Sequence, residues 1–341
     1  MKIDFSTQER PIANTEFEKQ VLSFLRNWND DSATVKVQTS GSTGTPKVFD
    51  IEKERMRHSA KMTCDILGLK ESDTALLCLP VEYISGKMMV VRAIERKMNL
   101  IVKTPSVNPI KDLNQEITFG AMSPLQVENS LDKIHLIKNI IIGGAVVSES
   151  LKTKIFQQLK GAKTQSQIFE TYGMSETLSH IALKQIYPVA EEYFTVLGNI
   201  KISLDERGCL QIDAPQLNPE ILKTNDLVEI KNEKEFKFLG RIDHVINSGG
   251  LKIYPEQLEK LVKKEIPNEV VFLGIPDEIL GQKSVLLVEG QENKQIIERL
   301  KILNYPSKNH KPKEIIFLET FPRIPNGKID RQKLIESVYK G

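Results

Sequence analysis

The chain has 341 residues, a length that predicts about two domains with a core that needs no disulfide or structural metal. Apolar residues make up 40% and charged residues 27%, which is typical of globular proteins. The 47 basic and 45 acidic residues leave a formal net charge of +2, which argues against a dedicated nucleic-acid-binding protein. The three cysteines are far apart, so we expect buried free thiols.

The first ten residues are polar and contain no apolar core of a signal peptide. No stretch of the chain approaches the roughly 18 apolar residues that a membrane-spanning helix requires. We therefore expect a protein without a membrane span that resides in the cytoplasm.

The first two thirds of the chain predict alternating helices and strands. Thr15 and Glu18 fit a capping box before an amphipathic helix that continues to Trp28. Strands are predicted over 34–39, 75–79, 99–102, 117–119 and 138–142, and helices over 56–67 and 148–159. Because the strands are apolar without interruption and alternate with helices, they predict an α/β fold whose mainly parallel sheet is flanked by helices.

After about residue 190 the predicted elements change. Short strands with alternating polarity are predicted over 200–204, 210–212, 227–231 and 235–239, which indicates a small antiparallel region. A second globular part follows, with a helix over 254–266 and strands over 270–274, 284–289 and 315–319. The boundary between the parts is predicted at 240–244, where a strand ends in a polar turn.

A Gly/Ser/Thr-rich loop follows the strand predicted over 34–39. It consists of Thr39, Ser40, Gly41, Ser42, Thr43, Gly44, Thr45, Pro46 and Lys47. Glycines let backbone N–H groups approach an anion, hydroxyl groups donate hydrogen bonds and the lysine adds positive charge. The spacing is not that of a Walker A loop, because the glycines are too close together and proline precedes the lysine. The loop predicts a phosphate site rather than a merely flexible connection.

Four further motifs follow this loop. They are Tyr172-Gly173-Met174-Ser175-Glu176-Thr177, Gly240-Arg241-Ile242-Asp243, the glycine-containing segment 248–256 and Pro325-Asn326-Gly327-Lys328-Ile329-Asp330-Arg331. In sequence and order the five motifs resemble those of the adenylate-forming superfamily of acyl-CoA synthetases, luciferases and peptide-synthetase adenylation domains. The resemblance implies a large N-terminal lobe over 1–240, a hinge over 241–243 and a smaller, mobile α+β C-terminal lobe over 244–341.

The resemblance also implies a reaction. A carboxylate attacks the α-phosphate of ATP, pyrophosphate leaves, and the acyl-adenylate then passes its acyl group to coenzyme A. Because the transition state carries dispersed negative charge, positioned cations and hydrogen-bond donors supply most of the catalysis. The implied catalytic residues are Lys47, Lys328 and Glu176, and Glu176 would also hold Mg²⁺ through its hard carboxylate oxygens.

The nucleotide site that the resemblance implies draws on several motifs. Tyr172 would stack on adenine, while Asp226 and Arg241 would contact the ribose; a core tyrosine and a structural ion pair are the alternatives. Asn225 stands where glycine is usual in the family, which leaves the turn geometry open. The implied set is Thr39, Ser40, Gly41, Ser42, Thr43, Gly44, Gly144, Tyr172, Gly173, Thr177, Asp226 and Arg241.

The resemblance implies that the second step, thioester formation, uses other residues. Asp243 resembles the hinge about which the small lobe swings, so that Lys328 enters for adenylation and leaves for thioester formation. Gly249, Gly250 and Lys252 would then lie along the path of the thiol donor, where glycines permit a close approach.

A short sequence segment narrows the identity of the substrate acid. Tyr83, Ile84, Ser85 and Gly86, followed by Arg92, resemble the HVSG…R segment of 2-succinylbenzoate–CoA ligases of menaquinone biosynthesis, with Tyr83 in place of histidine. The segment 179–183, Ser-His-Ile-Ala-Leu, resembles the same subgroup. Arg92 would pair with a carboxylate of the dicarboxylic substrate, for which a guanidinium is suited. The alternative is an arginine on a helix face beside Arg96.

Only 38 residues precede Thr39, so we expect most of the N-terminal subdomain usual in this family to be absent. The shortened sheet must cover its edge in another way, and we expect either a homodimer or a covering helix over 15–28.

The sequence therefore favours a 2-succinylbenzoate–CoA ligase. A ligase for another aryl or acyl acid, with CoA or a carrier protein as the acceptor, is the second hypothesis. A nucleotide-binding module that has lost turnover is the third, and the presence of Lys47, Glu176 and Lys328 argues against it.

Overall fold

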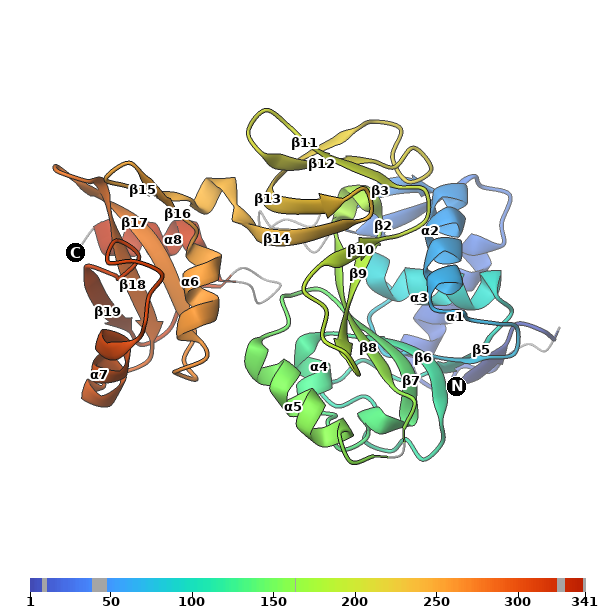
Figure 1. Ribbon diagram of the computed structural model, residues 1–341. Helices are drawn as coiled ribbons and strands as arrows, with labels where there is room; N and C mark the ends of the chain where they lie inside the picture. The colour runs from blue at the N-terminus through green and yellow to red at the C-terminus, as the bar shows by residue number, and fades with distance from the viewer. Residues whose placement is uncertain (8–10, 39–47, 163, 324–328, 340–341) are drawn as a thin grey trace.

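A computed structural model describes residues 1–7, 11–38, 48–162, 164–323 and 329–339 (Figure 1). Their strands form sheets of twelve, five and two strands. In the largest sheet the strand order is β1-β5-β4-β6-β7-β8-β9-β10-β14-β13-β12-β11. No helix in the described part of the chain is long and apolar enough to cross a membrane.

The centre of the large sheet is parallel, as predicted. It consists of β5 (Asn99–Val102), β4 (Thr74–Leu77), β6 (Ile117–Met122), β7 (Ile137–Ile142) and β8 (Gln167–Gly173). Alternate residues point to opposite faces, so Ala75 and Leu77 lie in one apolar cluster and Leu76 in another. The first cluster includes buried residues of α1 (Glu16–Trp28), α2 (Lys53–Ile66) and α3 (Ile84–Glu95), and the second those of α4 (Pro124–Glu128) and α5 (Glu149–Leu159). Helices therefore cover both faces, which confirms the α/β fold class.

The predicted antiparallel region continues the same sheet. It contains β9 (His180–Tyr187), β10 (Phe194–Val196), β14 (Glu235–Arg241), β13 (Leu222–Asn232), β12 (Cys209–Asp213) and β11 (Lys201–Leu204). Strand β8 pairs with the parallel β7 on one side and with the antiparallel β9 on the other. This change of direction places the end of β8 next to the start of β9, where several predicted site residues lie.

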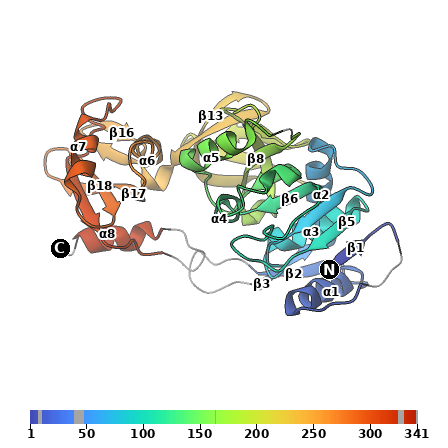
Figure 2. The ribbon, with the colours of Figure 1, turned by 90° about the horizontal axis from the view of Figure 1, so that it is seen from below.

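The edge beside β5 is occupied by β1 (Lys2–Asp4), a three-residue strand that was not predicted. Helix α1 begins at the predicted capping box of Thr15 and Glu18 and lies beside β1 (Figure 2). The carboxylate of Glu18 also accepts a 2.7 Å hydrogen bond from the Met1 ammonium group. A strand and a helix thus cover this edge, and the expected homodimer stays a prediction.

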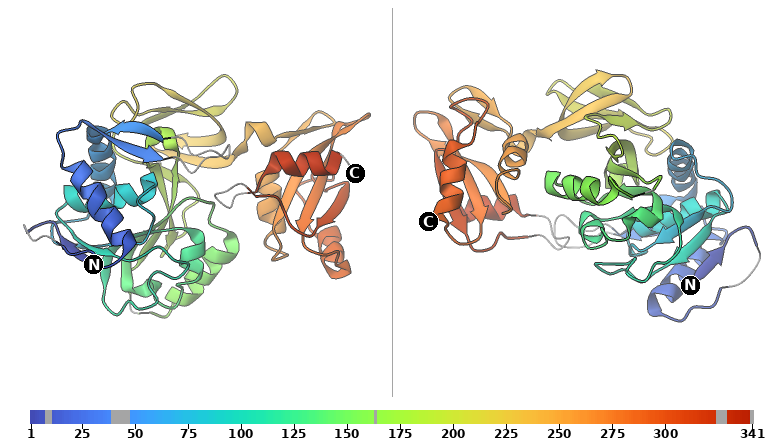
Figure 3. Two further views of the ribbon diagram at one scale, coloured as in Figure 1. Left: turned by 180° about the vertical axis from the view of Figure 1, so that it is seen from behind. Right: turned by 60° about the horizontal axis from the view of Figure 1, so that its bottom comes forward.

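The five-stranded sheet holds the C-terminal part of the chain (Figure 3). It contains β16 (Leu251–Ile253), β15 (Ile246–Ser248), β18 (Gly281–Glu289), β17 (Val270–Asp277) and β19 (Glu314–Leu318). The same part of the chain contains the helices α6 (Pro255–Val262), α7 (Lys294–Ile302) and α8 (Arg331–Tyr339). The turn η3 (Ile242–His244) follows β14 and leads into this part. The sheets change where the boundary was predicted, while the division into a core, a hinge and a mobile lobe stays a prediction.

The two-stranded sheet pairs β2 (Thr34–Gln38) with β3 (Val48–Glu52). These strands flank the predicted phosphate loop, whose residues 39–47 lie outside the described residues. Cys64, Cys78 and Cys209 are buried free thiols, as expected.

Candidate active site

Tyr172 lies near the end of β8 and contacts β13. Its hydroxyl donates a 2.5 Å hydrogen bond to Asp226 Oδ2, and its ring packs edge-on against Phe236 at a centroid distance of 5.0 Å. Burial, and then the charge of Asp226, raise the pKa of Tyr172, so the hydroxyl remains a donor. The aromatic packing fits the core-tyrosine alternative as well as an adenine platform, so the proposed stacking stays a prediction.

Asp226 belongs to an ionic cluster with Arg241 and Asp243. The register of β13 and β14 places Asp226 opposite Arg241, whose Nη1 lies 3.7 Å from Asp226 Oδ1. Arg241 Nη2 also donates a 2.9 Å hydrogen bond to Asp243 Oδ2, which lowers the pKa of Asp243. The two predicted ribose-binding residues and the predicted hinge residue are therefore joined in the structure.

Asn225, the departure from the family pattern, completes this cluster. Its side-chain amide lies 3.1 Å from both carboxylate oxygens of Asp243, and its carbonyl accepts a 2.9 Å hydrogen bond from Arg207. The amide thus links β13 to the turn after β14, a contact that glycine could not make.

Glu176 is exposed on the short turn η2 (Ser175–Thr177) directly after β8. Thr177 holds this turn, because its buried hydroxyl group lies 3.0 Å from both the backbone nitrogen and the carbonyl oxygen of Met174. Asn218 donates a further 3.2 Å hydrogen bond to the backbone carbonyl of Glu176. Within the described ranges no group of three or more His, Cys, Asp or Glu side chains could hold a metal ion.

Gly173 and Gly86 are required by close packing. A Cβ atom on Gly173 would lie 2.4 Å from the carbonyl oxygen of Ser179, and one on Gly86 would lie 2.3 Å from that of Pro80. Gly144, a further predicted nucleotide-site residue, follows β7 with a φ of +86°. The structure thus assigns Gly173 a packing role at the junction of β8 and β9.

Arg92 is buried inside the molecule on α3, with 2% of its surface exposed. Its Nη2 donates a 2.8 Å hydrogen bond to Ser179 Oγ, Nη1 lies 3.7 Å from Met89 Sδ, and Nε has no partner in the structure. Burial lowers the pKa of Arg92 to about 10. No ion pair among the described residues involves Arg92. Because Arg92 lies on α3 with Arg96 as the C-cap residue, both the acid-binding role and the alternative of a helix-face arginine stay predictions.

The other predicted acid-site residues lie at the start of α3. Tyr83 is its exposed N-cap residue and forms an isolated parallel bridge with Gln38, the last residue of β2. Ser85 is exposed in the first turn of the helix. This bridge brings the beginning of α3 to the strand that precedes the phosphate loop.

The predicted thioester-step residues lie apart from these clusters. Gly249 and Gly250, with φ values of +58° and +80°, form the turn between β15 and β16, and Lys252 is exposed on β16. In the part of the chain that the structure describes, no hydrogen bond or ion pair joins these three residues to Tyr172 or Arg92. Lys47 and Lys328 lie outside the described residues, as do the predicted loop residues 39–44.

The pair Glu259 and Arg331 was not predicted as a functional contact. Arg331 Nη2 lies 2.7 and 2.6 Å from the two carboxylate oxygens of Glu259, which also accepts a 2.8 Å hydrogen bond from the backbone of Phe272. The sequence did contain an indication of this contact. Glu259 lies next to Leu258, which belongs to the apolar face that this helix packs against the core, so its charge would need a partner.

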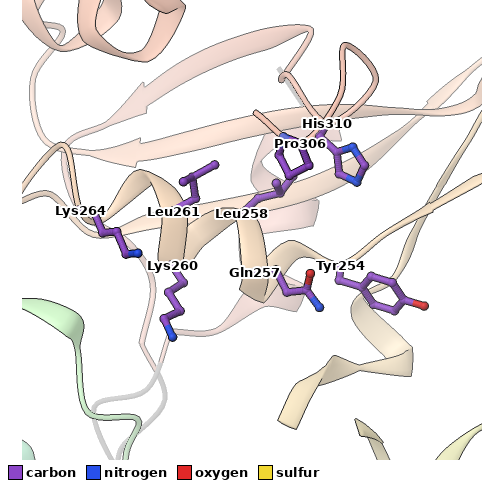
Figure 4. Close-up of a pocket in the computed structure, with 8 residues that line it drawn as sticks. All are labelled: Tyr254, Gln257, Leu258, Lys260, Leu261, Lys264, Pro306 and His310. Atoms are coloured by element: carbon purple, nitrogen blue, oxygen red, sulfur yellow. The ribbon is translucent and has the colours of Figure 1, made fainter. Parts of the chain in front are cut away.

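A pocket of about 300 Å³ lies on the C-terminal part, between α6 and the segment before β19 (Figure 4). Leu258, Leu261 and Pro306 supply its apolar lining, and Lys260 and Lys264 are among its charged residues. It shares no lining residue with the Tyr172 or Arg92 clusters, so it is distinct from the candidate site.

A family model for the AMP-binding enzymes matches residues 4–205, more than half of the chain. The chain belongs to the AMP-binding enzyme family. Curated relatives include the 2-succinylbenzoate–CoA ligases of Listeria monocytogenes serotype 4b, 28% identical over 95% of this chain and 74% of the relative, and of Staphylococcus aureus strain JH9, 25% identical over 100% and 73%. The superfamily predicted from the motifs is therefore confirmed.

Solved structures agree with this membership. A protein of Dyadobacter fermentans described as acyl-CoA synthetase (AMP-forming)/AMP-acid ligase II-like is 33% identical, with a TM-score of 0.66 and 99% coverage of both chains. The Bacillus subtilis O-succinylbenzoate coenzyme A synthetase in complex with ATP and magnesium has a TM-score of 0.72 at 21% identity, over 88% of this chain and 69% of its own. The second likeness concerns the fold alone.

Proposed function

We propose that this chain is an ATP-dependent acid–CoA ligase that activates 2-succinylbenzoate for menaquinone biosynthesis. A carboxylate oxygen bonds to the α-phosphorus of ATP as the bond to pyrophosphate breaks. The thiol sulfur of coenzyme A then bonds to the acyl carbon, AMP leaves and the thiol proton is released. The observation that carries the choice of acid is the buried Arg92, which has no carboxylate partner in the described ranges of the chain.

A buried guanidinium without an anion is costly, because desolvation disfavours the charged form. Among the described residues, the polar contacts of the Arg92 guanidinium are one hydroxyl and one thioether, and its Nε–H has no partner there. A ligand carboxylate would supply the missing charge and match the planar guanidinium. Because 2-succinylbenzoate has two carboxylates, one can react while the other pairs with Arg92.

The nucleotide would bind near the end of β8. Asp226 would accept hydrogen bonds from the ribose hydroxyls with Arg241 beside it, and Tyr172 would lie against the adenine. The exposed carboxylate of Glu176 fits one ligand position of Mg²⁺, whose other ligands would come from phosphate oxygens and water. Bound there, the cation would neutralise charge that develops on the triphosphate.

The two steps would use two orientations of the C-terminal part. We propose that Asp243 is the hinge between residues 1–240 and 244–341, that Lys328 serves adenylation, and that Gly249, Gly250 and Lys252 serve thioester formation. Lys328→Ala should abolish adenylation yet largely spare thioester formation from supplied acyl-adenylate. Equal loss of both steps would contradict this division of labour. The proposal also places the enzyme in the cytoplasm, with a homodimer to be tested by sedimentation at high dilution.

The acid is tested with a panel of carboxylic acids, scored by acid-dependent exchange of pyrophosphate into ATP and by thioester formation with CoA. We expect 2-succinylbenzoate to be preferred over the two analogues that each lack one of its carboxylates. Arg92→Lys should raise KM for 2-succinylbenzoate at least about tenfold, the size expected for a lost interaction with a charged group, with KM for ATP unchanged. Arg96→Lys is the matched control, because Arg96 pairs with exposed Asp65 instead.

The competing hypotheses give different outcomes. Equal use of all acids, or equal sensitivity of all acids to Arg92→Lys, would favour a ligase for another acid. Transfer to a carrier protein in place of CoA would identify a carrier-loading enzyme. If no acid supports exchange of pyrophosphate into ATP, the result would favour the hypothesis of a nucleotide-binding module that has lost turnover.

A further inference from the structure

Arg92 is the first member of a buried hydrogen-bonded chain that ends on α2. From Arg92 Nη2 it passes at 2.8 Å to Ser179 Oγ, and from there at 3.2 Å to Nδ1 of His180. His180 Nε2 lies 3.1 Å from Thr63 Oγ1, which donates a 3.1 Å hydrogen bond to the carbonyl of Ser59. These residues come from three separate elements, so the chain exists only in the folded protein.

The chemistry of its ends fixes the direction of every hydrogen bond. The hydroxyl hydrogen of Thr63 is used on a carbonyl, so its oxygen accepts from an Nε2–H group of His180. Since Arg92 can only donate, Ser179 accepts from Arg92 and gives its own hydrogen to Nδ1 of His180. The arrangement is complete with a neutral His180 that carries its hydrogen on Nε2.

The backbone before Ser179 has an uncommon conformation that supports this chain. Leu178 is a buried non-glycine residue with a φ of +64°, and Ser179 N donates a 2.7 Å hydrogen bond to the carbonyl of Thr177 across it. Such three-residue turns are rare and strained, and strain of this kind is found chiefly at functional sites. The hydroxyl of Thr177 holds the turn by donating a 2.8 Å hydrogen bond to the Ser179 carbonyl.

We propose that Ser179 and His180 are positioning residues that fix the Arg92 guanidinium for the carboxylate of the acid that does not react, and so set the preference for a dicarboxylic substrate. This inference rests on the proposed function of Arg92. Ser179 holds one end of the guanidinium, His180 orients the Ser179 hydroxyl, and the Arg92 Nε–H is left for the ligand. An acid whose only carboxylate is the reacting one gains nothing from this arrangement.

Variants of the two residues test the proposal. Ser179→Ala removes the contact with Arg92, and His180→Gln can keep a donor toward Thr63 while losing the acceptor for Ser179. We expect each to raise KM for 2-succinylbenzoate roughly tenfold, the effect of losing one hydrogen bond to a charged group. The KM for ATP and the kcat/KM for the analogue that keeps only the reacting carboxylate should stay unchanged.

His180→Asn separates positioning from a general structural role. Its amide oxygen can occupy the place of Nδ1, so it should restore much of the preference that His180→Gln loses. His58→Asn is the control, because His58 is a partly exposed histidine on α2 that contacts the backbone of Glu54. Each variant is first compared with the wild type by thermal melting, and Ser179→Ala decides the question if a His180 variant does not fold.

The outcomes distinguish this inference from the proposed function. If Arg92→Lys leaves the preference for the dicarboxylic acid intact, the proposed function of Arg92 fails. If Arg92→Lys removes the preference while Ser179→Ala and His180→Gln keep it, the positioning role alone is overturned. Equal losses with all acids, or a changed KM for ATP, would also overturn that role.

Discussion

Glu259 and Arg331 form a partly buried ion pair in which one guanidinium nitrogen contacts both carboxylate oxygens, at 2.7 and 2.6 Å. The pair joins α6 to the first residue of α8, three positions after Lys328. On the other side of that lysine, Glu289 accepts 2.7 Å hydrogen bonds from the backbone of Phe321 and from Arg323. The chain is thus anchored to an acidic side chain both before and after Lys328.

Breaking the Glu259–Arg331 pair should destabilise the protein strongly. Arg331→Met leaves the Glu259 carboxylate, which is 12% exposed, without its cation. Loss of one member of a fully buried pair costs about 3–5 kcal/mol, so we expect a loss of roughly 2–3 kcal/mol for this partly buried pair. Burial already raises the pKa of Glu259. Urea unfolding followed by circular dichroism measures the loss, with exposed Lys333→Gln as the control. A loss below about 1 kcal/mol would show that the pair contributes no more than an exposed surface ion pair.

The Tyr172–Asp226 contact gives a second prediction. Tyr172→Phe keeps the packing against Phe236 but loses the hydrogen bond, so we expect a loss of about 1 kcal/mol in the free energy of unfolding. Asp226→Asn should raise KM for ATP more than Tyr172→Phe does, because it removes the proposed ribose acceptor. Steady-state kinetics at saturating acid checks this order, and the reverse order would argue that Asp226 serves only to hold Tyr172 and Arg241.

His180 should make the stability depend on pH. Burial, and then the charge of Arg92, lower the pKa of His180 well below its ordinary value of 6.5. Below that ordinary value the unfolded chain binds a proton that the folded protein does not, so stability is lost as the pH falls below about 6.5. The slope reaches at most about 1.4 kcal/mol per pH unit for one proton.

Urea unfolding of the wild type and His180→Asn at pH 7.5 and 5.5 measures this contribution. The free energy of unfolding of the variant should fall less between the two pH values, while His58→Asn should follow the wild type. An identical fall in the wild type and His180→Asn would show that His180 titrates normally.

Glu176→Gln should weaken the dependence on Mg²⁺. The amide oxygen is a poorer ligand than the carboxylate for a hard cation, so we expect the Mg²⁺ concentration at half-maximal adenylation to rise about tenfold or more. A Mg²⁺ titration of pyrophosphate exchange measures the shift, with exposed Glu206→Gln as the control. An unchanged midpoint with normal turnover would remove Glu176 from the proposed metal site.

The sequence predicts most of the central sheet because its strands carry a local signal. The apolar run before Gly143 appears as β7, and the capping box at Thr15 begins α1 as expected. Short strands such as β1 and β15, with three residues each, have no period long enough to detect and depend on distant pairing. The register that joins β8 to β9 is equally non-local.

In the candidate site, too, the sequence predicts what has a local signal and misses what depends on contacts between distant residues. Motifs identify Tyr172, Asp226, Arg241 and Asp243, which the structure brings together. The contact of Arg92 with Ser179 spans 87 positions and that of Thr63 with His180 spans 117, so no spacing along the chain indicates them. Only the fold reveals that Arg92 is buried with a hydroxyl in place of a carboxylate partner.

The separation of β2 and β3 from the two larger sheets has a consequence for local opening. Among the described residues, the ladder hydrogen bonds of β2 and β3 run only between these two strands, apart from one bridge of Gln38 to Tyr83. The hairpin can therefore break its ladder without disturbing the hydrogen bonds of the parallel strands. The amide hydrogens of the hairpin should therefore exchange with solvent deuterium faster than those of β6 and β7. Their exchange should become as slow as that of β6 and β7 only when a bound ligand contacts both the hairpin and the rest of the molecule.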